Sequence, residues 1–235
     1  MPSRLSRRQL LRATGVGVAS TLVGPSLAEA FTARESVPAG VTPKQALALL
    51  VAGNRRWVEG RATNPAQSVG RRNALTHVQH PFATIVSCID SRVPPELVFD
   101  RGIGDLAVIR TGAQVLDLGV ILGSIEFAAD HLATPLIVVM GHQRCGAVKG
   151  AIDTIKSGGK APGHIQPIID GLRPAYAVAV KETGDLVDNM VRAQTKLAVE
   201  QLRQDPLVHE LIAEGKLLVA GAHYSLDTGT ASFIA

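Results

Sequence analysis

Short apolar runs, each ended by glycine, proline or polar residues, recur through the middle and end of this 235-residue chain. Between the runs, apolar positions repeat at helical spacing, with a break expected near Gly184. Strands that alternate with helices predict an α/β fold with a central, mostly parallel β-sheet flanked by helices. The expected strands span 83–87, 106–110, 136–140 and 217–222, and the expected helices span 116–131, 145–157 and 164–204.

The two ends of this pattern add further elements. Thr42 followed by Pro43 is typical of a helix start, and the apolar positions after it predict an N-terminal helical arm of about four turns. A second helix is expected over 66–78. Near the end of the chain, residues 224–234 contain an Asp/Gly turn, which predicts a hairpin that adds a C-terminal antiparallel edge strand.

The first 30 residues have the parts of an export signal in order. Paired Arg7 and Arg8 precede a weakly apolar run over 13–23, and Ala28 and Ala30 form a small-x-small end. This order is typical of a cleavable presequence, and the paired arginines favour the twin-arginine route. The run is too short and too rich in glycine for a stable membrane anchor. A basic, disordered tail is the alternative interpretation.

We therefore expect residues 1–30 to be a twin-arginine signal peptide, recognised by the twin-arginine export machinery and cleaved after Ala30. Residues 31–235 would then form one domain, and the protein would be periplasmic or otherwise exported. Four arginines and one glutamate lie in the first 30 residues, so the net charge of +4 falls to about +1 in residues 31–235. That charge and the absence of a basic stripe with interleaved aromatics argue against a nucleic-acid partner.

Both cysteines of the chain lie close to another good metal ligand. Cys88 precedes Asp90 by two residues, and Cys145 follows His142 by three. Thiolate, imidazole and carboxylate are the ligands that Zn²⁺ takes in tetrahedral sites. A single disulfide would also satisfy the cysteine count in an oxidising compartment, and two buried structural thiols would satisfy it in a reducing one.

The expected sheet brings these residues to one edge. Cys88 follows the strand expected over 83–87, and His142 follows the strand expected over 136–140. Ligands of open parallel sheets bind beyond the carboxyl ends of the strands. Cys145 opens an expected helix, where backbone N–H groups stabilise a thiolate. The sequence therefore predicts a metal site at this edge.

The number of ligands decides whether such a site is catalytic. Three ligands, Cys88, His142 and Cys145, would leave a fourth position for water, which zinc acidifies until hydroxide forms near neutral pH. Asp90 in that position would close the site. Arg92 is placed to hold the Asp90 carboxylate in a bidentate pair instead, which makes Asp90 an exchangeable ligand.

In these motifs the chain resembles the β-class carbonic anhydrases. The resemblance covers essentially all of residues 31–235, and the two cysteine motifs together make it specific. It is carried by the stretches 88–94 (CIDSRVP), 104–105 with Arg110, 141–148 (GHQRCGAV) and 224–229 (YSLDTG).

The resemblance implies zinc on Cys88, His142 and Cys145, with Asp90 and Arg92 as the catalytic dyad that positions the hydroxide or caps the metal. It implies a carbonate dehydratase, a zinc lyase that reversibly hydrates carbon dioxide to bicarbonate and a proton. In that reaction hydroxide on zinc attacks CO₂, and water then displaces bicarbonate.

The resemblance also implies substrate-binding residues and an oligomer. Gln79 matches a glutamine that reaches the substrate from across a dimer interface, and Gly146 matches a backbone donor beside it. A homodimer or a dimer of dimers follows from that match. His80 and His223 are weak candidates for a proton shuttle, because a lone histidine is more often structural.

Some positions depart from the family pattern. Ala107 and Phe127 stand where the family often has Phe and Tyr, which suggests a wider pocket wall. Residues 110–114 depart from an Arg-x-Ala-Gly-Asn stretch. Ile85 stands where a bicarbonate-inhibited subgroup carries Trp, which argues against that allosteric site.

Two other functions stay open. The same scaffold hydrolyses carbonyl sulfide or carbon disulfide if pocket access differs, and Ala107 keeps this alternative open. An exported, non-catalytic zinc- or bicarbonate-binding protein would result if Asp90 kept the site closed. A redox protein is disfavoured, because Cys88 and Cys145 do not form a Cys-x-x-Cys pair.

Overall fold

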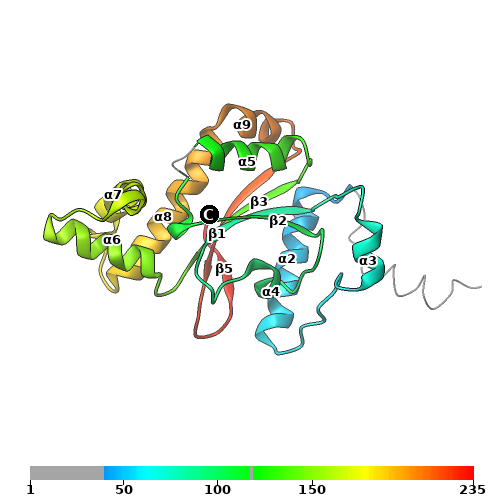
Figure 1. The fold of residues 1–235 in the computed structure, drawn as a ribbon, viewed down its shortest axis with the longest axis horizontal. Helices are drawn as coiled ribbons and strands as arrows, with labels where there is room; N and C mark the ends of the chain where they lie inside the picture. Colours follow the sequence, from blue (N-terminus) through cyan, green and yellow to red (C-terminus); the bar gives the residue numbers. More distant parts are fainter. Residues whose placement is uncertain (1–39, 117–118) are drawn as a thin grey trace, which may run out of the picture.

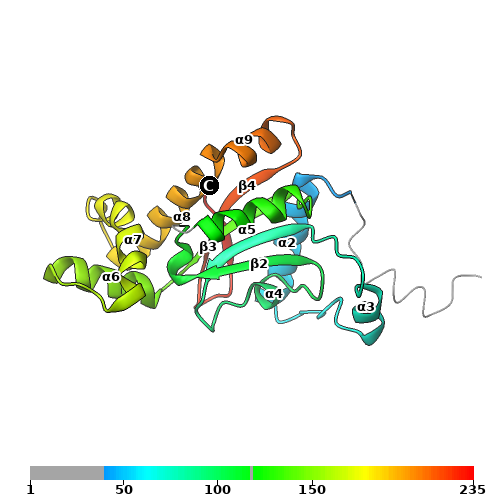
Figure 2. The same ribbon diagram turned by 45° about the horizontal axis from the view of Figure 1, so that its top comes forward.

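A five-stranded sheet forms the centre of the computed structural model, which describes residues 40–116 and 119–235. Its strand order is β2-β1-β3-β4-β5, with β2 at one edge (Figures 1 and 2). The first four strands are parallel and β5 is antiparallel to β4, which confirms the predicted fold class. The predicted signal peptide lies outside the described residues. The strands are β1 (Ala83–Cys88), β2 (Leu106–Thr111), β3 (Leu136–His142), β4 (Leu218–Tyr224) and β5 (Ala231–Phe233).

Helices surround this sheet in the alternation that the sequence predicts. The expected break near Gly184 is confirmed, since Gly184 has a φ of 102° and separates two long helices. The α-helices are α2 (Pro43–Val58), α3 (Val69–Ala74), α4 (Pro95–Val98), α5 (Gly119–Asp130), α6 (Gly146–Ser157), α7 (Gln166–Ala179), α8 (Leu186–Gln204) and α9 (Pro206–Ala213), with short 3₁₀ turns at Gly112–Gln114 and Gly163–Ile165. Among the described residues, no helix is both long and apolar enough to cross a membrane.

Helix α2 forms where the Thr42-Pro43 signal predicts it. The Thr42 hydroxyl accepts a hydrogen bond from the Gln45 backbone, and the Gln45 side chain accepts one from the Thr42 backbone. This reciprocal pair satisfies two N–H groups that a helix start otherwise leaves without a partner. Ala46 and Leu50 are fully buried against the sheet, so α2 is anchored by its apolar face as well as by its cap.

The prediction of a helix over 66–78 is wrong in its extent. Only α3, six residues long, forms there, after an N-cap hydrogen bond to Ser68. Asn64 and Ala66 have φ values of 48° and 54°, which a right-handed helix excludes. The backbone before α3 is instead held by Asp100, whose carboxylate accepts hydrogen bonds from the amides of Thr63 and Asn64.

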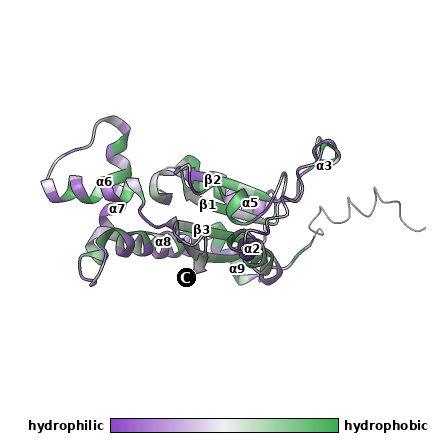
Figure 3. Cartoon of the chain, turned by 90° about the horizontal axis from the view of Figure 1, so that it is seen from below, coloured by the Kyte–Doolittle hydropathy of each residue, from purple (hydrophilic) through white to green (hydrophobic). Residues whose placement is uncertain are grey.

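Alternate residues of the central strands pack on opposite faces of the sheet. Ile85 and Val138 face the side covered by α2, whereas Val86 and Val139 face the side covered by α5, α8 and α9. In Figure 3, β1 and β3 are accordingly mostly coloured as hydrophobic. Burial on both faces is what a continuous apolar run predicts for parallel strands.

Helices α6 and α7 extend away from the sheet and pack on α8 (Figures 1 and 2). Their contact is apolar, formed by the fully buried Val148 and Ala151 of α6 and Leu172 and Ala175 of α7. This packing fixes the start of α6, the point at which the second cysteine lies.

Candidate metal centre

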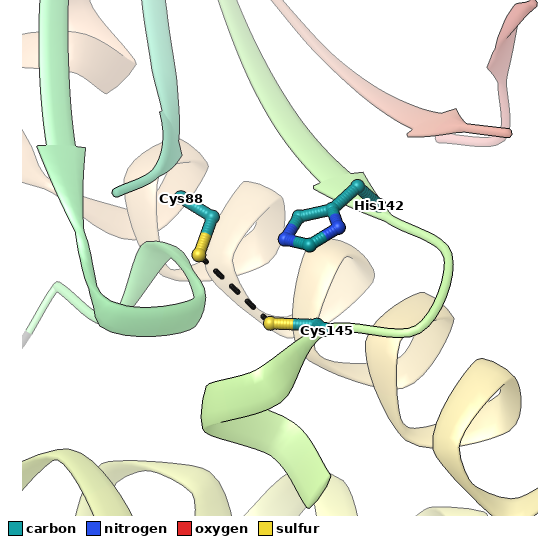
Figure 4. Close-up of side chains that lie close together, drawn as sticks. All are labelled: Cys88, His142 and Cys145. Carbon is teal, nitrogen blue, oxygen red and sulfur yellow. Dashed lines mark hydrogen bonds between the residues drawn. The ribbon is translucent and has the colours of Figure 1, made fainter. Parts of the chain in front are cut away.

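Cys88, His142 and Cys145 meet at one edge of the sheet. Cys88 ends β1, His142 ends β3, and Cys145 is the N-cap of α6. Because β1 and β3 are parallel neighbours, their carboxyl ends lie side by side. One ligand atom from each residue lies within 4.8 Å of the others, and all three residues are buried. Figure 4 shows the two sulfur atoms and the imidazole pointing toward one another.

The two thiols form a buried hydrogen-bonded pair. Their Sγ atoms lie 3.9 Å apart and both cysteines are free. The hydrogen bond from Cys145 lowers the pKa of Cys88 to about 4 against the opposing effect of burial, and the same pairing raises the pKa of Cys145. Backbone amides at Ala147 and Val148, in the first turn of α6, counteract that rise. The environment therefore favours a thiolate at Cys88, and a bound cation would favour a second one at Cys145.

The orientation of His142 fits a metal ligand. Its Nδ1 lies 3.0 Å from the Gln143 carbonyl oxygen, a contact in which Nδ1 donates and which turns Nε2 toward the two sulfur atoms. Nε2 is buried, and none of the described residues gives it a hydrogen bond. A buried polar atom without a partner is rare and costly. A metal held by both sulfurs and Nε2 would satisfy it.

Asp90 and Arg92 form an ion pair beside this group. Arg92 donates to Asp90 from its backbone N–H at 3.0 Å, from Nε at 2.9 Å and from Nη2 at 2.7 Å. These bonds hold the pKa of Asp90 well below its usual range, so the carboxylate stays ionised. Its Oδ2 also lies 3.8 Å from His142 Nε2. The predicted exchangeable ligand therefore has Arg92 on one side and the Cys-His-Cys group on the other.

Arg110 fixes the backbone between Cys88 and Asp90. Its Nε donates to the Cys88 carbonyl at 2.8 Å, and its Nη2 donates to the Asp90 carbonyl at 2.6 Å. The amide of Ile89 adds a hydrogen bond to the Thr111 carbonyl at 3.1 Å. Sequence reasoning placed Arg110 only within a matching neighbourhood and missed this role.

Three residues that hold the other side of the centre lie in stretches that match the family, but the sequence gave no role for them. Gln143 and Arg144, between two of the ligands, both bind the side chain of Asp227. The turn containing Asp227 was predicted, but its partners lie more than 80 residues away in the chain. Exposed polar residues at that separation leave no periodic signal.

The two predicted substrate-binding residues lie apart from each other. Gly146 begins α6, next to Cys145. Gln79 is exposed and precedes the amino end of β1, whereas Cys88 lies at its carboxyl end. A single chain therefore does not bring Gln79 to its own metal ligands, and the predicted contribution to a partner's site stays a prediction.

Three residues that depart from the family pattern, Ile85, Ala107 and Phe127, differ in where they lie in the fold. Ile85 is fully buried in the core, and Ala107 lies in the edge strand β2. Phe127 is 53% exposed and packs against His131, with the two ring centroids 4.5 Å apart.

His223, a weak candidate for a proton shuttle, is buried. Its Nε2 is bonded to Asp188 at 2.6 Å, so that nitrogen is already occupied.

Comparison with known proteins decides the family. A family model described as carbonic anhydrase matches residues 83–231. Carbonic anhydrase 2 of Mycobacterium tuberculosis (strain H37Rv) is 39% identical over 190 residues, which cover 80% of this chain and 91% of that protein. The β-carbonic anhydrase CcaA superposes with a TM-score of 0.65 and 25% identity, over 80% of this chain and 98% of that one. The chain belongs to the β-class carbonic anhydrases.

A second solved structure agrees with this result. The β-carbonic anhydrase CafA of Aspergillus fumigatus gives a TM-score of 0.64 at 27% identity, covering 81% of this chain and 90% of that one. The protein's enzyme class is therefore carbonate dehydratase, as the resemblance implied. Within this β-class carbonic anhydrase, the Cys-His-Cys group is a site that could bind a metal.

Proposed function

We propose that this protein binds Zn²⁺ through Cys88, His142 and Cys145 and reversibly hydrates CO₂ to bicarbonate and a proton. The observation that carries the proposal is the buried, unpartnered Nε2 of His142, which lies with two sulfur atoms in one cluster. Two thiolates and one imidazole suit zinc better than the harder cations, which prefer oxygen. When bound, zinc supplies a Lewis acid that lowers the pKa of a water molecule toward neutrality.

In the proposed mechanism, Asp90 orients the attacking water. Its carboxylate is ionised, and Oδ2 lies on the His142 side of the Arg92 pair, where it accepts a hydrogen bond from that water. Because this hydrogen bond uses an O–H of the water, its oxygen would stay free to face CO₂. The proton released by the reaction leaves to buffer.

Arg92 has the complementary role of keeping Asp90 off the metal. The Arg92 side chain is 52% exposed. Two nitrogen atoms of its guanidinium donate to Asp90, and this geometry resists rotation of the carboxylate. Asp90 is paired with Arg92 in the structure, and with zinc bound this arrangement would leave a coordination position for water. Rotation of Asp90 toward His142 would close the site.

Gln79 and Gly146 are proposed to bind the substrate in an oligomer. Because Gln79 precedes β1 at the end opposite to Cys88, it serves a site only if that site belongs to a second copy of the chain. We therefore propose a homodimer or a dimer of dimers in which Gln79 of one copy and the Gly146 amide of the other face the same substrate.

The deciding experiment is stopped-flow CO₂ hydration with the zinc-loaded protein from about pH 6.5 to 9, a range that brackets a zinc-activated water. Cys145→Ser serves as the blank. Activity that exceeds the blank supports the proposal. Activity restricted to high pH would indicate that Asp90 caps the metal at lower pH. No turnover with one zinc per chain would refute CO₂ hydration and favour a sulfur-substrate hydrolase or a zinc- or bicarbonate-binding protein.

Export is a separate proposal. We propose that residues 1–30 direct the protein through the twin-arginine machinery to the periplasm, which would allow zinc to bind the two cysteines before they meet an oxidising compartment. Replacing Arg7 and Arg8 by lysine in the full chain should leave the protein uncleaved in the cytoplasmic fraction. Wild-type distribution of that variant would contradict the twin-arginine route.

A further inference from the structure

Two residues, Gln143 and Arg144, connect the ligands His142 and Cys145. Arg144 has a φ of 53°, in the left-handed region that non-glycine residues adopt only at a cost. Movement in so short a connection displaces His142 or Cys145 directly. The metal geometry therefore depends on whatever holds Gln143 and Arg144 in place.

Gln143 is held by the turn that follows β4. Its backbone N–H donates to the Tyr224 carbonyl at 2.9 Å, and its Oε1 accepts from the Leu226 amide at 3.1 Å. Its Nε2 donates to Oδ2 of Asp227 at 2.9 Å. The backbone N–H of Gln143 and both polar atoms of its side chain are thus bound to one turn, while its carbonyl binds His142 Nδ1.

Arg144 is held by the same carboxylate. Its Nη1 and Nη2 donate to Oδ2 and Oδ1 of Asp227 at 3.1 and 2.6 Å, a two-pronged contact that fixes direction as well as distance. The Arg144 carbonyl in turn accepts a hydrogen bond from Arg92 Nη2 at 3.4 Å. Asp227 therefore binds a residue that also contacts the Asp90–Arg92 pair.

The turn that carries Asp227 is itself anchored in the core. The Gly229 amide donates to the Ser225 carbonyl at 2.9 Å. The buried side chain of Asn54, from α2, donates to the Gly229 carbonyl at 2.9 Å and accepts from the Ala231 amide at 2.9 Å. Asp227 thus projects from a fixed support and is not carried by a free loop.

We propose that Asp227 is a positioning residue of the metal centre. By binding Gln143 and Arg144 together, it keeps His142 and Cys145 at the spacing that a metal ion requires. Residues that orient metal ligands typically change metal affinity by about 10- to 100-fold when they are lost. This inference rests on the proposed function, since the metal concerned is the proposed zinc ion.

The alternative is that the Asp227–Arg144 contact is an ordinary surface ion pair without consequence. Their side chains are 58% and 53% exposed, and exposed pairs often contribute little. The chain contains a matched control for this alternative. Asp170 is 52% exposed and also accepts from one glutamine and one arginine, Gln166 and Arg173, on the surface of α7.

The test compares zinc release from Asp227→Ala and Asp170→Ala proteins loaded with one zinc per chain. Transfer of zinc to a coloured chelator, 4-(2-pyridylazo)resorcinol, gives the release rate without any use of activity. We expect Asp227→Ala to release zinc about tenfold faster or more, and Asp170→Ala to release it at the wild-type rate. Urea unfolding of both metal-free variants checks that any difference is local to the metal centre.

Further variants test whether Asp227 acts on the metal centre through Arg144. Asp227→Glu should recover part of the slow release, and adding Arg144→Ala to Asp227→Ala should change the rate less than Arg144→Ala does alone, because the two residues act on each other. The cobalt-loaded Asp227→Ala protein should show altered visible absorption, since the ligand geometry changes.

The outcomes separate this inference from the proposed function. If the wild-type protein does not retain zinc, the zinc centre itself is refuted. If the wild type retains zinc and Asp227→Ala releases it no faster than Asp170→Ala, the positioning role alone is overturned.

Discussion

The Arg92 guanidinium donates two hydrogen bonds to the Asp90 carboxylate, at 2.9 Å from Nε and 2.7 Å from Nη2. The Asp90 oxygen that accepts the second bond is the one 3.8 Å from His142 Nε2. A single carboxylate oxygen thus lies between a permanent cation and the proposed metal. In the proposed mechanism, whether this oxygen stays on Arg92 or binds the metal would determine whether a coordination position is available to water.

Replacing Arg92 by alanine should therefore shift Asp90 toward the metal. We expect CO₂ hydration by the zinc-loaded Arg92→Ala protein to fall by about 10- to 100-fold, without loss of zinc. Stopped-flow rates and metal analysis of the same samples test both parts. Arg173→Ala removes a similarly exposed arginine from an aspartate on α7 and should keep wild-type activity. Arg92→Ala activity within about twofold of wild type would contradict the gating role.

Metal removal should weaken the fold as well as abolish turnover. The ligands come from β1, β3 and the start of α6, so an ion bound to all three stabilises only the folded chain. Free zinc at about 1,000 times its dissociation constant adds about 4 kcal/mol to the free energy of unfolding.

Thermal unfolding with and without a chelator measures this contribution. The wild-type melting temperature should fall on chelation, and that of Cys145→Ser should hardly change. A wild-type melting temperature that does not change when the chelator is added would argue against a metal at these residues.

Acidification should destabilise the metal-free protein through His223. Burial lowers the pKa of His223 below its unfolded value of 6.5, although Asp188 opposes the shift. Nε2 donates to Asp188 at 2.6 Å and Nδ1 faces Arg192 at 3.3 Å, where a second ring proton would meet a guanidinium. The unfolded chain therefore binds the proton more readily, and the free energy of unfolding falls as the pH drops below about 6.5.

Urea unfolding at about pH 7.5 and about pH 5.5 tests this dependence. His223→Gln should reduce the difference between the two conditions, whereas replacing the exposed His164 should not. Burial raises the pKa of Asp188, but Arg192 and His223 outweigh burial and lower it. Asp188 should therefore lose its own contribution to the free energy of unfolding at still lower pH. An unchanged pH dependence in His223→Gln would exclude His223 as the responsible group.

Local patterns were sufficient to predict the strands and the cluster of residues that could bind a metal. Strands β1 and β3 end at Cys88 and His142, close to the ends of the apolar runs, and Cys145 follows three residues after His142. Parallel strands then place Cys88 and His142 at one edge without further information. The Thr42 cap and the break at Gly184 were likewise local signals, and both were confirmed.

The features that the sequence did not predict depend on distant partners. Before α3, which begins only at Val69, Asp100 binds the amides of Thr63 and Asn64 from more than 30 residues away. Asp227 contacts Arg144 across 83 residues. Polar contacts at such separations follow from the folded geometry alone, so helix and strand periodicity does not reveal them.

Asn54 binds three backbone groups in two segments of the chain and should be among the most sensitive polar residues. Its Nδ2 donates to the carbonyls of Val98 and Gly229 at 3.0 and 2.9 Å, and its Oδ1 accepts from the Ala231 amide at 2.9 Å. Asn54→Ala would leave these backbone groups without partners in a buried region, and each such loss is costly. We expect the free energy of unfolding to fall by about 2–4 kcal/mol.

Asn189→Ala is the matched control, because the side chain of Asn189 donates one hydrogen bond, to the Thr183 carbonyl at 3.1 Å near the surface. Its loss should cost less than about 1 kcal/mol. Urea unfolding of both metal-free variants gives the comparison. Because Asn54 also anchors the turn that carries Asp227, the zinc-loaded Asn54→Ala protein should release zinc faster than Asn189→Ala does. Equal stabilities of the two variants would show that water replaces the lost partners at Asn54.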